Sequence, residues 1–250
     1  MIAPCRLPCD YSILIEALES LRVGELLTLW PGAGGVRQLV ELVRLLAVDP
    51  SLTCSGWAVF SIVRKELLAV GKIRSAAAEN LLADRLLGLQ KNISEMLEQL
   101  SLGEGDVLIC EAPTTMRDPK AAFKVEQVRC MFEILGRQRG ALVPGRVNPR
   151  TVQYELLGQG GKQLGRKLVK HSAAQTVRQL YARDFERLGF PTELEELQRQ
   201  QDIVDAILLG TLALARIEEA NRAQLDLGEV MGSEERRSTG RGLKFRMAAR

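Results

Sequence analysis

Hydrophobic positions recur along the chain with two different spacings. Short apolar runs of the kind found in buried strands cover residues 45–48, 56–63, 67–73, 107–110 and 142–147. Elsewhere apolar residues return every three or four positions, which predicts amphipathic helices over 76–100, 120–139, 149–157, 167–188 and 198–220. Three strands in a row predict an antiparallel meander. The order βββαβαβ followed by helices predicts a single α/β domain, with a mixed five-stranded sheet flanked by helices.

Both ends of the chain depart from this pattern. Residues 1–43 combine helix-type spacing with a break at Pro31 and three nearby glycines, so we expect a partly helical N-terminal extension. These glycines predict a loop and not a phosphate-binding site, because no Gly-Lys-Ser/Thr follows them. Residues 221–250 lose periodicity and gain Arg, Gly and Ser, which predicts a basic, flexible tail. The domain itself is expected over 44–220.

Composition narrows the class of protein. The 250 residues are 46% hydrophobic and 26% charged, which is typical of a soluble globular chain and excludes collagen-like and disulfide-scaffold proteins. Apolar runs fall well short of the ~20 residues of a membrane span, and the N-terminus lacks the basic and apolar regions of a signal peptide. We therefore expect a cytoplasmic protein without membrane contact, associated with the nucleoid in a bacterial or phage setting.

The net charge of +3 hides an uneven distribution. Residues 137–187 hold eleven basic and three acidic side chains, and residues 236–250 hold six basic and none acidic. Such stretches favour polyanionic partners, although many are simply solvated faces. The five scattered cysteines and the single His171 lack metal-ligand spacing, which argues against a zinc site and against Cys/His or Ser/His catalysis.

Four carboxylates stand at positions where they can meet. Asp49 ends the first predicted strand, Glu111 ends the fourth, and Asp202 and Asp205 lie three residues apart on one face of the last helix. Each acid alone is commonplace, but together they form an all-oxygen ligand set. Repulsion between them favours bound cations, of which Mg²⁺ suits oxygen ligands best. Two such ions can cleave a phosphodiester by in-line displacement.

Three segments carrying these acids resemble the RuvC family of Holliday-junction resolvases, within the ribonuclease H-like superfamily. They are LLAVDPSLTCSGWAVF, VLICEAP and QDIVDAILLG, in the family's order along residues 44–220. The resemblance implies a ribonuclease H-like fold and a homodimer that cleaves branched DNA such as four-way junctions, leaving 5′-phosphate and 3′-hydroxyl ends. It implies that the acids bind two Mg²⁺ ions, for which Mn²⁺ substitutes. The metal-binding catalytic residues would be Asp49, Glu111, Asp202 and Asp205.

The resemblance also indicates basic residues that act on DNA. KLVKHSAAQTVRQLY is similar to the family's basic segment, so Lys170 would stabilise charge on the scissile phosphate. Contacts to the DNA backbone are expected from Lys162, Arg166, Lys167 and Arg178, and a further DNA contact is expected from Arg117. The family usually carries an aromatic wedge soon after its second acid. This chain has none before Phe123, and Met116 or Arg117 is the candidate replacement.

Several alternatives stay open at this stage. The helix over 120–139 can supply a dimer interface, pack on its own sheet, or do both. An actin-like nucleotide-binding protein shares an opening strand and hairpin of this kind, but Ser51 stands where that class has glycine. A non-catalytic scaffold that binds junctions is the second alternative, and retention of all four acids argues against it.

Overall fold

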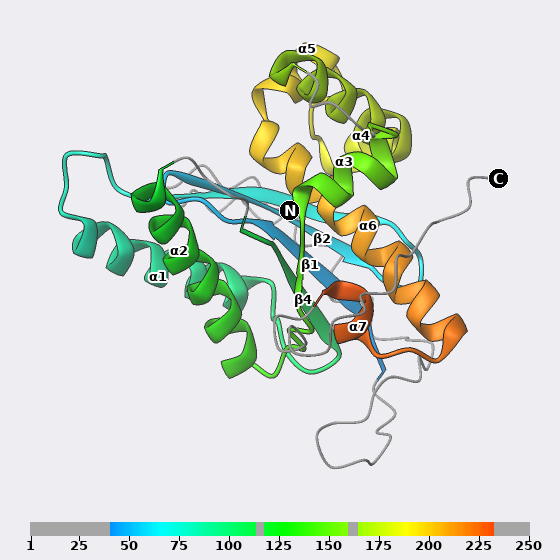
Figure 1. Ribbon diagram of the computed structural model, residues 1–250, viewed down its shortest axis with the longest axis horizontal. Helices are drawn as coiled ribbons and strands as arrows, with labels where there is room; N and C mark the ends of the chain where they lie inside the picture. Colours follow the sequence, from blue (N-terminus) through cyan, green and yellow to red (C-terminus); the bar gives the residue numbers. More distant parts are fainter. Residues whose placement is uncertain (1–40, 114–117, 160–164, 233–250) are drawn as a thin grey trace, which may run out of the picture.

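The computed structural model describes residues 41–113, 118–159 and 165–232, with one mixed sheet at its centre (Figure 1). Its five strands lie in the order β3-β2-β1-β4-β5. β1, β2 and β3 form an antiparallel meander, and β1, β4 and β5 run parallel, which confirms the expected sheet. The strands are β1 (Arg44–Asp49), β2 (Cys54–Ser61), β3 (Leu67–Arg74), β4 (Asp106–Glu111) and β5 (Arg146–Val147).

Helices cover both faces of the sheet (Figure 1). Two pack on one face, namely α1 (Leu82–Gln99) and α2 (Pro119–Gln138). The other face is crossed by α6 (Gln201–Ala223), around which lie α3 (Pro149–Leu157), α4 (Arg166–Leu188), α5 (Leu194–Arg199) and α7 (Leu227–Met231). No helix within the described ranges combines the length and hydropathy that a membrane span needs.

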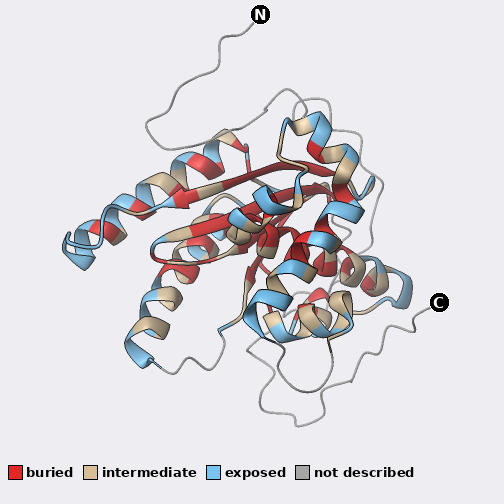
Figure 2. Cartoon of the chain, turned by 90° about the horizontal axis from the view of Figure 1, so that it is seen from above, coloured by how far each residue is buried: buried red, intermediate tan, exposed pale blue. Residues whose placement is uncertain are grey.

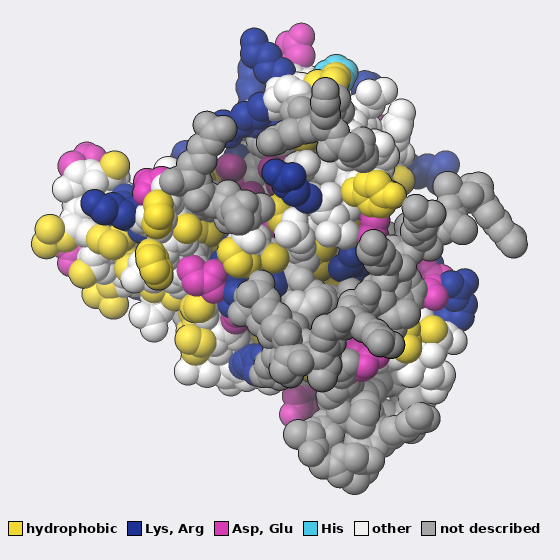
Figure 3. All heavy atoms as spheres, in the orientation of Figure 1, with side chains coloured by type: hydrophobic (Ala, Val, Ile, Leu, Met, Phe, Trp, Pro, Cys, Tyr) yellow, Lys and Arg dark blue, Asp and Glu magenta, His cyan; other side chains and the backbone are white. Residues whose placement is uncertain are grey.

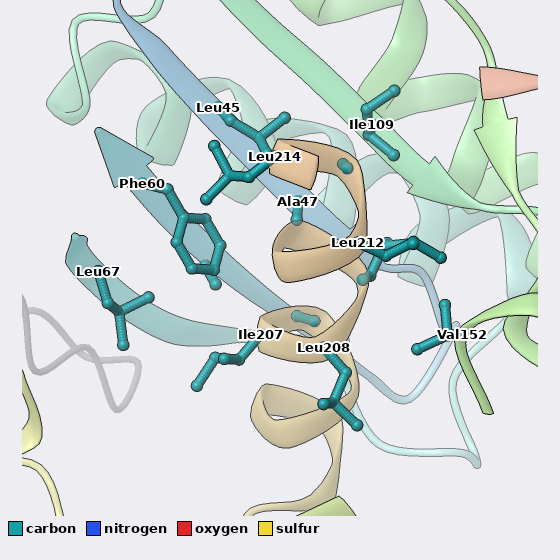
Figure 4. Close-up of a cluster of buried hydrophobic side chains, with 14 of the residues drawn as sticks. Leu45, Ala47, Phe60, Leu67, Ile109, Val152, Ile207, Leu208, Leu212 and Leu214 are labelled. Carbon is teal, nitrogen blue, oxygen red and sulfur yellow. The ribbon is translucent and has the colours of Figure 1, made fainter. Parts of the chain in front are cut away.

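Alternation along the strands divides the interior into two cores. On β1, Leu45 and Ala47 face α6, whereas Leu46 and Val48 face α1 and α2. Both faces of the central strands are therefore buried, as the burial colours of Figure 2 show. Figure 4 shows how side chains of α6 enter the first of these cores between β1 and β2. This packing fixes α6, and with it the end of α6 that carries two of the predicted acids.

Some element boundaries differ from the expectation. The fifth strand spans only Arg146–Val147, with an isolated bridge from Leu142 to Val107, because Pro144 lacks an amide N–H for strand pairing. The helix expected over 76–100 begins at Leu82, since a turn closes at Asn80. The helix expected over 198–220 is broken near Gln200 into α5 and α6.

The tail expected from residue 221 is wrong at its beginning. Helix α6 continues to Ala223, and a short helix, α7, follows it. Leu227 and Met231 of α7 are buried in the α6 core, so apolar packing orders this segment despite its weak periodicity. The N-terminal extension and the basic end of the tail fall in residues 1–40 and 233–250, outside the described residues.

Candidate active site

Asp49 and Glu111 lie side by side at the carboxyl ends of the two central strands. Asp49 is the last residue of β1 and Glu111 the last of β4, and these strands are parallel. Their register pairs Val48 with Cys110, so the next position on each strand brings the two acids into one cross-strand row. Both side chains project on the face covered by α6, because the residues two positions earlier belong to that core.

Asp202 and Asp205 reach the same row from the first turns of α6. Gly56 pairs with Asp49 across β1 and β2, and a Cβ at Gly56 would overlap the backbone carbonyl of Asp202. The beginning of α6 therefore lies directly against the sheet beside Asp49. The three-residue spacing keeps Asp205 on the same helical face as Asp202. The structure thus brings the four predicted acids into one neighbourhood.

Burial and mutual repulsion both act on the acids of this site. Burial raises the pKa of Asp49 well above its usual value, and the charges of Glu111, Asp205 and Asp202 raise it further. Burial and the charge of Asp205 raise the pKa of Glu111 to about 7. The pKa of Asp205 is raised to about 6, again mainly by burial. The site holds more negative charge than its surroundings neutralise, so protons or cations would relieve it.

The carboxylate donors of the four acids suit a hard divalent cation, but their side chains are not arranged as a complete coordination sphere. Carboxylate oxygens are the ligands that Mg²⁺ prefers, and their repulsion supplies a reason to bind it. Among the described residues, no three His, Cys, Asp or Glu side chains are grouped closely enough to hold one ion. The fit to a metal therefore rests on donor chemistry and on unbalanced charge.

Two of the acids are engaged by neighbours that the sequence analysis missed. The Nζ atom of Lys72 lies 3.2 Å from Oδ2 of Asp202. The amide of Gln201 donates to Oδ1 of Asp205 at 2.7 Å, while its own carbonyl oxygen is buried and has no partner among the described residues. A lysine inside an otherwise apolar strand, and a glutamine next to an acid, were the available signals.

A buried arginine, also missed, supports Glu111 from α2. Arg129 is only 1% exposed, and its Nε donates to the backbone carbonyl of Glu111 at 2.6 Å. Its guanidinium also pairs with Glu126 one turn earlier on the helix. The charge of Arg129 lowers the pKa of Asp49 and of Glu111, against the rise caused by burial. Arg129 thus fixes the end of β4 and offsets part of the repulsion.

Helix α4 also contributes basic residues near the acids. Lys170 and Arg166, four residues apart and on one helical face, both lower the pKa of Asp205. Lys170 is half-buried inside α4, within the helix expected over 167–188. Lys167 and Arg178 are exposed on the same helix. The remaining predicted DNA contacts, Arg117 and Lys162, lie outside the described residues.

Comparisons with known sequences give relatives of one kind. No protein-family model matches this chain. The crossover junction endodeoxyribonuclease RuvC of Bartonella bacilliformis is 30% identical over 124 residues, which are 49% of this chain and 71% of the relative. The enzyme of the same name from Bartonella quintana is 31% identical over 124 residues, covering 49% of this chain and 70% of the relative.

Comparison with solved structures finds proteins of the same name as these sequence relatives. RuvC of Thermus thermophilus in complex with Holliday junction substrate superposes with a TM-score of 0.52 and 18% identity, covering 70% of this chain and 96% of that one. A second Thermus thermophilus RuvC structure gives 0.50 and 19% over the same shares. This likeness confirms the ribonuclease H-like fold. With two relatives at least 30% identical over more than two thirds of their length, the chain belongs to the RuvC family of crossover junction endodeoxyribonucleases.

Proposed function

We propose that this protein is a metal-dependent endonuclease that resolves Holliday junctions or other branched DNA. The observation that carries the proposal is the row of Asp49 and Glu111 facing the two aspartates of α6, where burial and then repulsion raise the pKa of Asp49. The relatives are named crossover junction endodeoxyribonucleases, and one similar structure is a complex with Holliday junction substrate. Family and acid cluster support the same chemistry.

The acids would act by holding two Mg²⁺ ions, with Mn²⁺ as a substitute. Bound divalent ions supply an activated water and stabilise the leaving oxygen of a phosphodiester. The chain contributes position: β1 and β4 hold two acids in register, and the contact at Gly56 holds the first turn of α6 against them. The proposed ligands are Asp49, Glu111, Asp202 and Asp205.

Basic residues of α4 would bind the DNA backbone and hold it next to these acids. Lys170 lies near enough to Asp205 to lower the pKa of that carboxyl, so its ammonium can neutralise charge that develops on the scissile phosphate. Arg166 shares the effect on Asp205, and we assign Arg166, Lys167 and Arg178 to phosphate binding. Arg117 and Lys162 stay predicted DNA contacts. Affinity for DNA should fall steeply with salt.

A second copy of the chain would complete the assembly, so that two sites meet two opposed strands. Val128 and Phe132 of α2, the helix considered for the interface, are buried on the protein's own sheet. The outer surfaces of α1 and α2 nevertheless expose large hydrophobic side chains, among them Leu87, Phe123 and Ile134. Hydrophobic side chains gather over these helices in Figure 3. An apolar surface of this kind supports a homodimer through α1 and α2.

The test is cleavage of a labelled four-way junction by the wild-type protein and by Asp49→Asn, in Mg²⁺ and in chelator. We expect paired nicks that need the metal, and a loss of at least about 1,000-fold in rate for Asp49→Asn. Glu218→Gln is the matched control, because Glu218 is an exposed acid paired with Lys65 away from the site. Its rate should equal that of the wild type.

The same assay separates the alternatives. Binding of the junction without cleavage in Mg²⁺ or Mn²⁺ would reject the nuclease in favour of a binding scaffold. Cleavage that survives Asp49→Asn would place the chemistry elsewhere. Removal of residues 236–250 tests the basic end of the chain, since an unchanged affinity and salt slope would show that it does not bind DNA.

A further inference from the structure

A positively charged side chain of the sheet, Lys72, lies beside the acidic site. The proposed function gives this residue no role. Lys72 of β3 pairs across the sheet with Gly56 of β2, which in turn pairs with Asp49 of β1. Residues directly opposite one another on neighbouring strands project on the same face. Lys72 therefore lies in the same row as Asp49, on the face covered by α6.

Gly56 makes the contact between Lys72 and α6 possible. Because Gly56 has no side chain, the backbone of α6 at Asp202 rests directly on the middle of the row. The side chain of Lys72 then reaches Asp202 from the neighbouring strand, with 3.2 Å between Nζ and Oδ2. A bulkier residue in the middle would hold the helix away from the strand and separate the two charges.

This ion pair differs from the surface pairs of the molecule. The side chains of Lys72 and Asp202 are 12% and 38% exposed, whereas those of Lys65 and Glu218 are 56% and 62% exposed. An ion pair that is partly shielded from water is screened less by salt than a pair on the open surface. The ammonium of Lys72 thus acts on Asp202 as a built-in positive charge.

We propose that Lys72 is a positioning residue that serves as the resident counter-cation of Asp202, and that a divalent ion must compete with it for this carboxylate. The inference rests on the proposed role of Asp202 as a metal ligand. Lysine suits exchange of this kind, since it carries a compact charge on a flexible stem and can withdraw without breaking a two-point contact. Lys72 thereby lowers the metal affinity of the site and keeps Asp202 in place when no metal is bound.

The test measures metal binding directly, so that it does not depend on catalysis. The full chain is titrated with Mn²⁺, and free Mn²⁺ is followed by electron paramagnetic resonance. Lys72→Met should bind Mn²⁺ roughly tenfold more tightly than the wild type, because a positive charge near a divalent ion has been removed. Lys72→Arg keeps the charge and should stay within about threefold of the wild type.

Lys65→Met is the matched control, because it removes a lysine from an ion pair far from the acids and should leave Mn²⁺ affinity unchanged. Lys72→Gln guards against misfolding of the methionine variant, since it removes the charge but can still donate to Asp202. Its affinity should also rise. In chelator, both neutral variants should melt below Lys65→Met, because Asp202 has lost its counter-cation.

An affinity of Lys72→Gln equal to or weaker than that of the wild type overturns the proposal. A failure of the proposed function itself would give a different result in the Mn²⁺ titration. In that case the wild type would bind Mn²⁺ no better than Asp49→Asn does, and the metal site as well as the role of Lys72 would be lost. If the wild type binds Mn²⁺ through Asp49 but Lys72→Gln binds it equally well, only the role of Lys72 is rejected.

Discussion

The beginning and the middle of α6 approach the same face of the sheet with different chemistry. In the middle, Gly210 lets the ring of Phe60 pack against the helix, and the neighbouring side chains are apolar (Figure 4). At the beginning, the glycine is on the strand instead: Gly56 lets the helix backbone at Asp202 approach β2. Two side chains at this end, Asp202 and Asp205, are acids that repel one another.

The difference shows how one helix can carry an unfavourable site. Apolar burial in the middle of the helix stabilises the fold, at roughly 25 cal/mol for each Å² of apolar surface removed from water. The acids at its beginning oppose folding unless protons or cations neutralise their charge. Because both parts belong to one helix, packing in the middle positions the charges at the beginning. Changes in the two parts should therefore have different consequences.

Among changes to the contacts of α6 with the sheet, the largest effect is expected from Gly56→Ala. The new Cβ would overlap the carbonyl of Asp202 and approach the amide nitrogen of Ile203, both of which are backbone atoms that cannot rotate away. The first turn of α6 must then move off the sheet and carry its acids with it. A displacement of about 1 Å at reacting groups costs on the order of 100-fold in rate. Single-turnover cleavage of a four-way junction measures the loss.

Gly88→Ala is the control for this prediction. Gly88 lies in α1, where a Cβ meets nothing within 4 Å, so alanine should leave cleavage unchanged and slightly stabilise the helix. A Gly56→Ala protein that cleaves at the wild-type rate would show that α6 need not touch β2 for the site to work.

The next effect concerns pH. The raised pKa values mean that the folded protein holds protons on Glu111 and Asp205 that the unfolded chain releases, between about pH 4 and the folded values of about 7 and about 6. In chelator, proton binding to these two carboxyls stabilises the folded state at low pH. This contribution to the free energy of unfolding is lost as the pH rises through that window. We expect a loss on the order of 3 kcal/mol in the free energy of unfolding.

Thermal melts between about pH 5 and pH 8, with and without Mg²⁺, measure this loss. Stabilisation by Mg²⁺ should grow with pH, because the ion binds the deprotonated acids. Glu111→Gln removes one titrating group and should flatten the pH dependence in chelator. A Mg²⁺ effect that is the same at both ends of the range would mean that these acids do not bind the ion.

The acids of the site follow from the sequence because their placement needs only strand ends. Asp49 and Glu111 each end an apolar run, and central parallel strands align their carboxyl ends. The helical spacing of Asp202 and Asp205 is likewise visible in the sequence. For this reason the sequence predicted the strands of the meander, the main helices and the four acids of the candidate site.

Lys72 depends on a detail that hydrophobic pattern does not encode. The register of β2 and β3 shifts by one residue between Val59 and Phe60. Continued from the Phe60–Leu67 pair without that shift, the register would place Gly71 opposite Gly56 and turn Lys72 to the other face. Arg129 was hidden for a related reason, because only the tertiary contact of α2 with β4 shows that its guanidinium reaches the Glu111 carbonyl.

The smallest effect is expected in the apolar middle of α6, from Gly210→Ala. The added Cβ would overlap the ring of Phe60, which cannot move freely because it packs edge-on against Tyr181 with 5.7 Å between ring centroids. Overpacking costs about 1–3 kcal/mol, and the better helix propensity of alanine returns up to ~1 kcal/mol. Urea denaturation should show a net loss of about 1 kcal/mol, while Mn²⁺ affinity and the cleavage rate of the folded protein stay unchanged. A Gly210→Ala protein with weakened Mn²⁺ binding would show that the middle and the beginning of α6 are coupled in function as well as in position.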